Sequence, residues 1–208
     1  AIARTGAFGG FSQLRLRGAG PGKTLVLIDG VPVNDPADIN GAYDFANLSL
    51  IDMERVEVLS GPQSSLWGSD AIGGVIAFTT REVDGLRAEL EAGSLNTQRG
   101  ALSVGRSGDR SALSLSVSGF RTDSVSAAAI GTEDDGYETL TTGLRGRLSP
   151  VDGVGLDGAL RWTKSRVEID GFPAPAFALA DTDDVSKGES WSGFGRMTVQ
   201  TGGVRHRL

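Results

Sequence analysis

Beyond residue 85, apolar and polar residues alternate with a period of two. The segment 111–121, SALSLSVSGFR, places Leu113, Leu115 and Val117 on one face and serines on the other. This period predicts strands with one apolar face and one wet face. We expect six of them, over residues 86–94, 98–106, 111–121, 137–148, 154–165 and 190–200. Most approach the roughly 9 to 11 residues of a tilted membrane strand, whereas soluble strands most often have about 5 to 6.

The connections between these strands differ in length in a regular way. Short turns at 107–110, 149–153 and 201–203 alternate with long connections at 122–136 and 166–189. In an up-and-down meander every second connection lies on the same side, so one rim would carry turns and the other long loops. Outer-membrane barrels have this asymmetry, with the long loops outside the cell. A secreted β-sandwich or solenoid would also alternate, and the pattern alone leaves it open.

The first 82 residues follow a different pattern, in which short apolar runs are separated by glycines. TLVLIDG (24–30) and GGVIAFTT (73–80) predict buried strands, and RVEVLSG (55–61) predicts an alternating one. Pro62 suits the first position of a helical turn in PQSSLWG (62–68). We therefore predict a small α+β domain over 1–82, followed over 83–208 by antiparallel strands.

The glycine-rich stretch GAGPGKT (18–24) superficially resembles a phosphate-binding loop. The position that such a loop needs as its first glycine is Arg17, and the loop leads into a strand instead of a helix. Nucleotide binding is therefore not expected, and the glycines are interpreted as a turn between two strands.

Composition excludes several further classes of protein. The formal net charge of −6 argues against nucleic acid as a partner. The absence of cysteine removes disulfides, thiolate metal sites and cysteine nucleophiles. The single histidine, His206, gives no base for the serines, so no enzyme activity is expected. The 31 glycines accompanied by only 7 prolines fit turns and strands better than collagen or low-complexity disorder.

Two stretches carry a resemblance to a known family: TLVLIDGVPVNDP (24–36) and RVEVLSGPQSSLWGSDAIGGVIAFTTRE (55–82). They resemble the plug domain of TonB-dependent outer-membrane receptors, and among these the vitamin B12 (cobalamin) receptors most. The resemblance implies a bacterial outer-membrane location, contact with outer-membrane lipid, and a 22-stranded transmembrane β-barrel filled by the plug. This chain would hold part of the plug, the first six strands and the beginning of a seventh. TonB would bind through a segment N-terminal to residue 1.

The resemblance also implies a function, the energised uptake of cobalamin or another corrinoid. A ferric-siderophore or haem receptor of the same superfamily is the nearest alternative, and a secreted β-rich adhesin is an alternative of another class. The loops 4–11 and 33–40 match the substrate-facing apex of the plug, although each of their residues could equally serve an ordinary surface turn. The substrate-binding candidates are Thr5, Gly6, Ala7, Phe8, Gly9, Asn34, Asp35, Asp38 and Asn40.

Acidic residues gather in the two long connections. Crowded carboxylates repel one another unless a cation is present, and calcium accepts six to eight oxygens from flexible loops. Solvated acidic loops stay an alternative on the residues alone. The resemblance implies Ca²⁺ bound in extracellular loops, although Glu133 replaces the family's aspartate and the first loop is shorter here. The implied ligands are Asp123, Glu133, Asp135, Asp170 and Asp181.

Other charged and aromatic residues receive structural interpretations. Plug residues could form salt bridges that hold the plug in the barrel, because a buried pair that loses a partner costs several kcal/mol. Trp162 and Trp191, near predicted strand ends, suit an aromatic girdle at a membrane interface. The plug charges considered are Arg15, Arg17, Glu54, Arg55 and Glu57.

Overall fold

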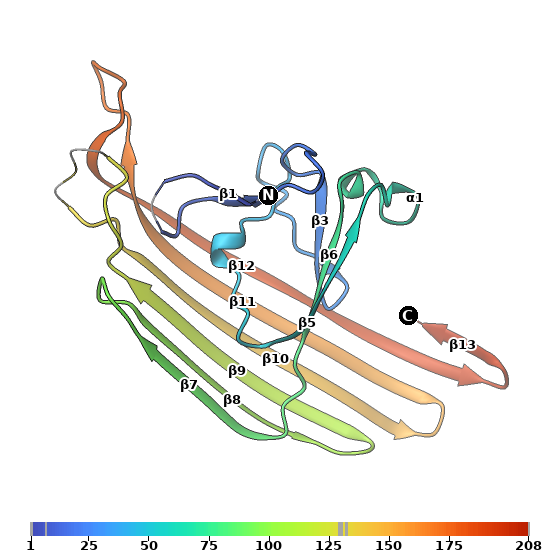
Figure 1. The fold of residues 1–208 in the computed structure, drawn as a ribbon. Coiled ribbons are helices and arrows are strands. Elements are labelled where there is room, and N and C mark those ends of the chain that lie inside the picture. Colours follow the sequence, from blue (N-terminus) through green and yellow to red (C-terminus); the bar gives the residue numbers. More distant parts are fainter. Residues whose placement is uncertain (1, 7, 129–130, 132, 208) are drawn as a thin grey trace.

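The computed structural model describes residues 2–6, 8–128, 131 and 133–207. A small N-terminal domain packs against the concave face of one large curved sheet (Figure 1). The small sheet of the N-terminal domain ends at Thr80, and the large sheet begins at Gly85. Among the described residues, no helix is long and apolar enough to cross a membrane.

The large sheet has seven strands that pair in sequence order, each antiparallel to the next. All six predicted strands are confirmed, and the last short strand is the expected start of a seventh. The strands are β7 (Gly85–Ala92), β8 (Gln98–Ser107), β9 (Ser111–Thr122), β10 (Tyr137–Val151), β11 (Val154–Gly171), β12 (Ala180–Thr201) and β13 (Val204–Arg207).

The predicted long connection 166–189 is wrong. β11 and β12 continue through most of it, with Arg166 directly opposite Lys187, and only 172–179 connects them. In this extension the face that is apolar along the rest of the two strands becomes polar, with Arg166, Glu168 and Lys187, so the signal that predicted the strands is lost there. Backbone pairing continues where the hydrophobic signal has ended.

The N-terminal domain is built on a four-stranded sheet in the order β4-β3-β6-β5, with β3 parallel to β6. β3 is buried along its whole length, as its continuous apolar run predicted. Its core cluster is Val26, Ile28, Met53, Ile76 and Phe78. The elements are β1 (Ile2–Arg4), β2 (Ser12–Leu14), β3 (Thr24–Ile28), β4 (Val31–Pro32), η1 (Phe45–Asn47), β5 (Met53–Ser60), α1 (Ser64–Trp67), η2 (Ser69–Ala71) and β6 (Gly74–Thr80).

The glycine-rich stretch is a turn between β2 and β3, as predicted. Gly18 and Gly22 both have positive φ, 76° and 70°, and the turn leads directly into the strand at Thr24. Because a strand and not a helix follows the turn, the stretch lacks the loop-to-helix order of a phosphate loop.

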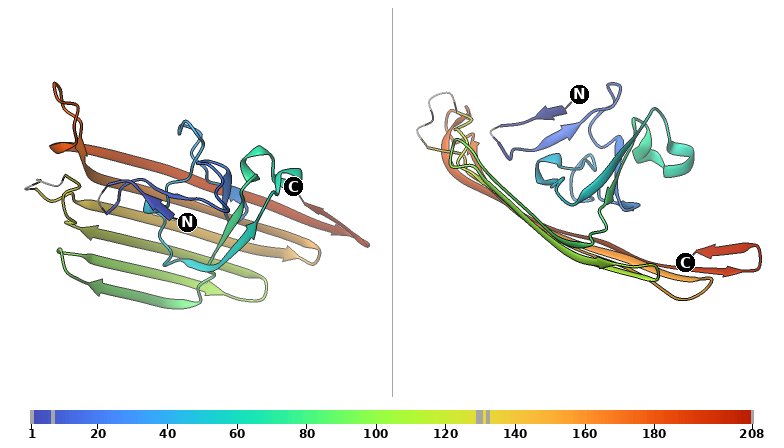
Figure 2. Two further views of the ribbon diagram at one scale, coloured as in Figure 1. Left: turned by 45° about the horizontal axis from the view of Figure 1, so that its top comes forward. Right: turned by 60° about the horizontal axis from the view of Figure 1, so that its bottom comes forward.

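The N-terminal domain lies against one face of the large sheet (Figure 2), and the two faces of this sheet have opposite character. Ser114, Ser118 and Thr163 are buried beneath that domain, whereas Leu113, Leu115 and Leu160 on the other face are exposed. A soluble sandwich would bury the apolar face and leave the polar one in water. This arrangement is that of a membrane barrel wall, with apolar residues outward and polar residues toward the lumen.

Candidate functional site

A buried ion pair joins the N-terminal domain to the large sheet. The guanidinium of Arg161, on β11, donates to the carboxylate of Asp52, and both side chains are about nine-tenths buried. The other terminal nitrogen of Arg161 donates to the carbonyl oxygen of Ser49 at 3.3 Å. The Ser49 hydroxyl also lies 3.1 Å from that of Ser118 on β9. Residues 49–52, just before β5, are thereby fixed to two strands of the large sheet, β9 and β11.

Two further arginines, both on β10, also contact the N-terminal domain. Arg145 lies 2.9 Å from the carboxylate of Asp29 and donates to the Thr80 hydroxyl at 3.0 Å. Arg147 lies 3.2 Å from the carboxylate of Glu82 in a more exposed pair. The three arginines occupy inward positions of neighbouring strands, and each meets a different carboxylate.

An aromatic cluster joins the β1–β2 loop to the edge of the large sheet that carries the connections 123–136 and 172–179. This edge is called the long-connection rim below. The ring of Phe8 stacks on Phe120 at 5.3 Å between centroids and lies 6.0 Å from that of Tyr137. The Tyr137 hydroxyl donates to the carbonyl oxygen of Ala46 at 2.8 Å, and the Phe8 amide donates to the Ser124 hydroxyl at 3.1 Å. The loop is thus held at that rim. Phe8 remains 45% exposed, so part of its side chain is open to solvent.

The loop 33–40 is shaped by its own polar side chains. The Asn34 carbonyl accepts from the Val26 amide at 2.7 Å, and its NH₂ group donates to the backbone oxygens of Thr24 and Gly41 at 3.0 and 2.8 Å. Asp35 and Asp38 accept from backbone amides within the loop. These three candidates therefore position the loop, and Asn40 lies exposed at its tip.

A groove separates this loop from β12. Val33, Asn34, Tyr43, Thr163 and Ser190 are among its lining residues. Burial raises the pKa of Tyr43 to about 12, so its hydroxyl stays protonated at neutral pH. The groove therefore combines aromatic surface with hydrogen-bonding groups, a combination that suits an amphipathic ligand.

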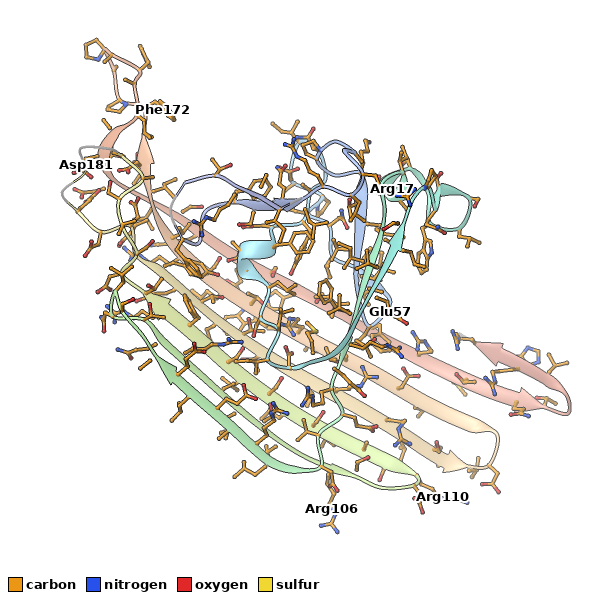
Figure 3. All side chains as sticks on the ribbon, in the orientation of Figure 1. Arg17, Glu57, Arg106, Arg110, Phe172 and Asp181 are labelled. Atoms are coloured by element: carbon orange, nitrogen blue, oxygen red, sulfur yellow. The ribbon has the colours of Figure 1, made fainter. Side chains whose placement is uncertain are left out.

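Three predicted metal ligands meet at the long-connection rim. Carboxylate oxygens of Glu133, Asp170 and Asp181 all lie within 4.8 Å of one another, and all three residues are half-buried. Figure 3 shows Asp181 at this rim, close to the projecting connection that carries Phe172. Asp170 and Asp181 lie at the ends of β11 and β12, not in a long loop as the sequence suggested.

The other two predicted ligands have different surroundings. Asp135 is buried beside the cluster, where its carboxylate accepts from the Ala127 amide at 2.7 Å. Asp123 is not part of the group of oxygens that meets here, and its amide donates to the carbonyl oxygen of Leu95.

Neighbouring carboxylates perturb the titration of this cluster. A hydrogen bond with Asp183, burial and nearby negative charges raise the pKa of Glu133 to about 7. Burial is also the main cause that raises the pKa of Asp135. A hard cation such as Ca²⁺ binds carboxylate oxygens, and it would offset the repulsion between closely spaced ones. Glu133, Asp170 and Asp181 therefore fit that ion.

Comparison with known proteins identifies the N-terminal domain. A family model described as "TonB-dependent Receptor Plug Domain" matches residues 1–75. The N-terminal domain is therefore similar to a plug domain. Below, "the plug" is the N-terminal domain and "the wall" is the large sheet.

Solved structures match nearly the whole chain in fold. The ferric enterobactin receptor of Pseudomonas aeruginosa is 16% identical, with a TM-score of 0.66 over 98% of this chain and 35% of that one. The ferric yersiniabactin uptake receptor of Yersinia pestis is 21% identical, with a TM-score of 0.65 over 97% and 34%. The outer-membrane ferripyoverdine receptor of P. aeruginosa is 16% identical, with a TM-score of 0.66 over 96% and 28%.

The chain therefore spans about a third of the length of these receptors and shares their fold over that part. One of them, the ferripyoverdine receptor, is described as a receptor of the outer membrane, which is the location expected for this chain. Their descriptions name receptors, in agreement with the expectation that the chain is not an enzyme.

The sequence-based interpretation missed the residues that hold the plug to the wall. Among the charges it considered, Arg55 pairs with Glu57 within β5, in an exposed contact of 3.6 Å. The ion pairs that the structure describes between plug and wall use Asp29, Asp52 and Glu82 instead. A usable signal existed, because the wall arginines stand at inward positions of otherwise serine- and glycine-rich strand faces.

Proposed function

We propose that this chain is part of a TonB-dependent receptor that captures a large nutrient at the cell surface and takes it up across the outer membrane. One observation carries the proposal: the plug is attached by ion pairs to the polar face of a sheet whose apolar face points away from it. Such an attachment blocks a lumen and can be released. A 22-stranded barrel, the number implied by the resemblance, is wide enough to need a plug.

Uptake in this proposal requires the plug to move relative to the wall, with TonB as the energising partner. Both Asp29 and Asp52 would lose their arginines, or move together with them, when the passage opens. Breaking a buried pair costs several kcal/mol, so spontaneous opening would be rare and an external input of energy would be needed. No covalent chemistry is involved.

A ferric siderophore is the first candidate ligand. The three matched receptors are described as receptors for ferric enterobactin, ferric yersiniabactin and ferripyoverdine. The candidate contact surface is the exposed part of Phe8 together with the exposed residues of the loop 33–40. Ala7, another candidate, lies outside the described residues, and Thr5, Gly6 and Gly9 belong to the same loop as Phe8.

A corrinoid captured with the help of calcium is the second candidate. It is supported by the meeting of Glu133, Asp170 and Asp181 at the long-connection rim and by the sequence resemblance. These three residues would hold Ca²⁺, with Asp135 beside them. The ion would order the connection 123–136 against the ends of β11 and β12, next to the loop that carries Phe8.

The decisive experiment measures binding of ferric siderophores and of cyanocobalamin to the full-length receptor in detergent, with calcium and with a chelator. Tight cyanocobalamin binding that weakens on chelation, and that Asp181→Asn weakens but Asp123→Asn does not, supports the corrinoid candidate. Siderophore binding that is indifferent to chelation supports the first candidate. Binding of neither class, together with no ligand-dependent growth advantage in cells, would contradict the uptake proposal.

A further inference from the structure

The outward face of the wall carries a sharp boundary between apolar and charged residues. Strand pairing places Leu102, Val117, Thr142, Trp162 and Trp191 in one row across β8 to β12. The two indoles lie 6.0 Å apart and both donate to the Glu189 carboxylate. Paired tryptophans at the edge of an apolar band mark the membrane–water interface.

Basic residues follow immediately, on the side of this row toward the long-connection rim. The next outward row contains Lys164 opposite Glu189, and the row after it runs Arg121, Glu138, Arg166 and Lys187. Residues at the alternate positions of the same strands, such as Tyr137 and Arg161, lie on the other face of the sheet and contact the plug. The four basic side chains therefore point away from the lumen, and all four are exposed.

A groove lies between the tryptophan row and the charged row. Leu90, Gly100, Gly119, Leu140 and Lys164 follow one another across β7 to β11. These residues line a single depression together with the charged row. A Cβ on Gly100 would come within 3.3 Å of the Leu90 side chain, so the two glycines keep the floor low between Leu90 and Leu140. Leu90, Gly100, Gly119 and Leu140 give this groove an apolar floor, which suits part of an acyl chain.

The charges of the patch are only partly neutralised within the protein. Arg121 lies 3.4 Å from Glu138, and Arg166 lies 2.7 Å from Glu168, with all four side chains at least one-third exposed. Within the described part of the chain, neither Lys164 nor Lys187 is within ion-pair distance of a carboxylate. Exposed pairs are worth little, so these arginines can exchange a carboxylate for a stronger, bidentate anion.

We propose that this patch and groove form a binding site for a lipid of the outer leaflet that carries phosphate on its headgroup. Arg121, Lys164, Arg166 and Lys187 would hold the phosphate, and an acyl chain would lie on Gly100 and Gly119. The long-connection rim is the extracellular one in outer-membrane barrels, which places the patch at the outer leaflet. Clusters of lysine and arginine beside a membrane span bind anionic headgroups, at about 1 kcal/mol for each basic residue.

The test uses the full-length receptor in detergent and diphosphoryl lipid A as the probe, with the fully dephosphorylated glycolipid for comparison, read by native mass spectrometry. The double variant Arg166→Gln/Lys187→Gln is expected to weaken binding of the phosphorylated probe about tenfold or more. The matched control, Arg106→Gln/Arg110→Gln, removes two arginines from the opposite rim, where both lie away from the plug (Figure 3). It is expected to bind like the wild type.

A second variant works in the opposite direction and does not depend on loss of function. Glu138→Gln removes the carboxylate that competes for Arg121, so binding of the phosphorylated probe should tighten severalfold while that of the dephosphorylated probe stays unchanged. The proposal is overturned if the wild type binds both probes equally. It is also overturned if the two double variants lose affinity to the same extent, or if Glu138→Gln leaves the affinity for the phosphorylated probe unchanged.

Discussion

Arg145 of the wall lies 2.9 Å from Asp29, the residue that follows the buried strand β3 of the plug. The same carboxylate accepts from the amide and the hydroxyl of Thr80, at 2.9 and 2.6 Å, and is only 5% exposed. Asp29 thus joins three parts of the molecule: the end of β3, the end of β6 and the inner face of β10. The sequence analysis included this residue only as part of the segment TLVLIDG, yet it is one of the attachment points of the plug.

Removing Arg145 should therefore loosen the plug at this point. Arg145→Gln leaves the buried Asp29 carboxylate without its counter-charge, and we expect local opening of β3 and β6 to become easier by about 2 to 3 kcal/mol, less than for a fully buried pair because Arg145 is 30% exposed. Hydrogen exchange of the β3 and β6 amides in the full-length receptor measures this. Arg55→Gln, which breaks an exposed pair, is the control and should change exchange by less than about 1 kcal/mol. Equal effects would show that the Arg145 contact is not an attachment point.

Two glycines of the β2–β3 turn provide a matched pair of substitutions. Both have positive φ, but a Cβ on Gly22 would come within 1.6 Å of the Asn40 carbonyl oxygen, whereas nothing lies within 4 Å of one on Gly18. Gly18→Ala should cost about 1 kcal/mol from backbone conformation alone. Gly22→Ala should cost at least about 2 kcal/mol more, because backbone has to move. Thermal unfolding of the two variants compares them, and similar losses would mean that the turn and the loop 33–40 are not packed as described.

The sequence predicted best where hydrophobic burial decides the structure. The continuous run from Leu25 to Ile28 and the alternation around Leu113 each reflect which faces are covered, so strand positions followed from them directly. The signal failed between residues 166 and 189, where the outward face becomes polar although the two strands stay paired. There the backbone pairing of neighbouring strands determines the structure, and no single segment encodes that pairing in its own composition.

The site was predicted less completely, for a related reason. Glu133, Asp170 and Asp181 were proposed as a group and do meet, although the resemblance had also included Asp123, which lies apart from them. The contacts between plug and wall join residues more than 60 positions apart, such as Arg145 and Thr80 or Arg161 and Asp52. Their pairing depends on how the plug is oriented against the large sheet. A single sequence, read by itself, contains no direct record of that orientation.

The raised pKa of Glu133 predicts a pH dependence of the long-connection rim. Its folded value of about 7 lies above the ordinary 4.5, so the folded rim binds the proton more tightly than the unfolded chain does. This contribution to stability is greatest at low pH and is lost as pH rises from about 4.5 through about 7. Without divalent cations, residues 133–136 should therefore exchange amide hydrogens faster at pH 8 than at pH 5, after correction for intrinsic rates.

Glu133→Gln isolates this group from the other carboxylates, since the amide mimics the protonated acid. The corrected pH dependence should flatten in this variant and persist in Asp123→Asn, whose carboxylate lies outside the cluster. If Glu133→Gln keeps the full wild-type dependence, another group is responsible and the crowding of Glu133 with Asp183 is not what the rim senses.

The outward face of the wall can be tested for contact with lipid by two leucines of the same strand. Leu144 and Leu148 of β10 are almost equally exposed, at 45% and 46%, but Leu148 lies near the turn at 152–153, whereas Leu144 lies farther from that turn, beside Leu160 on β11. If the face contacts water, arginine at either position should change stability little. If it contacts lipid, Leu144→Arg should cost about 2 to 4 kcal/mol, and Leu148→Arg, close to the interface, about 0 to 1 kcal/mol. Unfolding of the full-length receptor from lipid vesicles by denaturant measures the difference. Equal and small costs for both variants would contradict a membrane-spanning wall, and a larger cost at Leu148 would place the apolar band nearer the short turns.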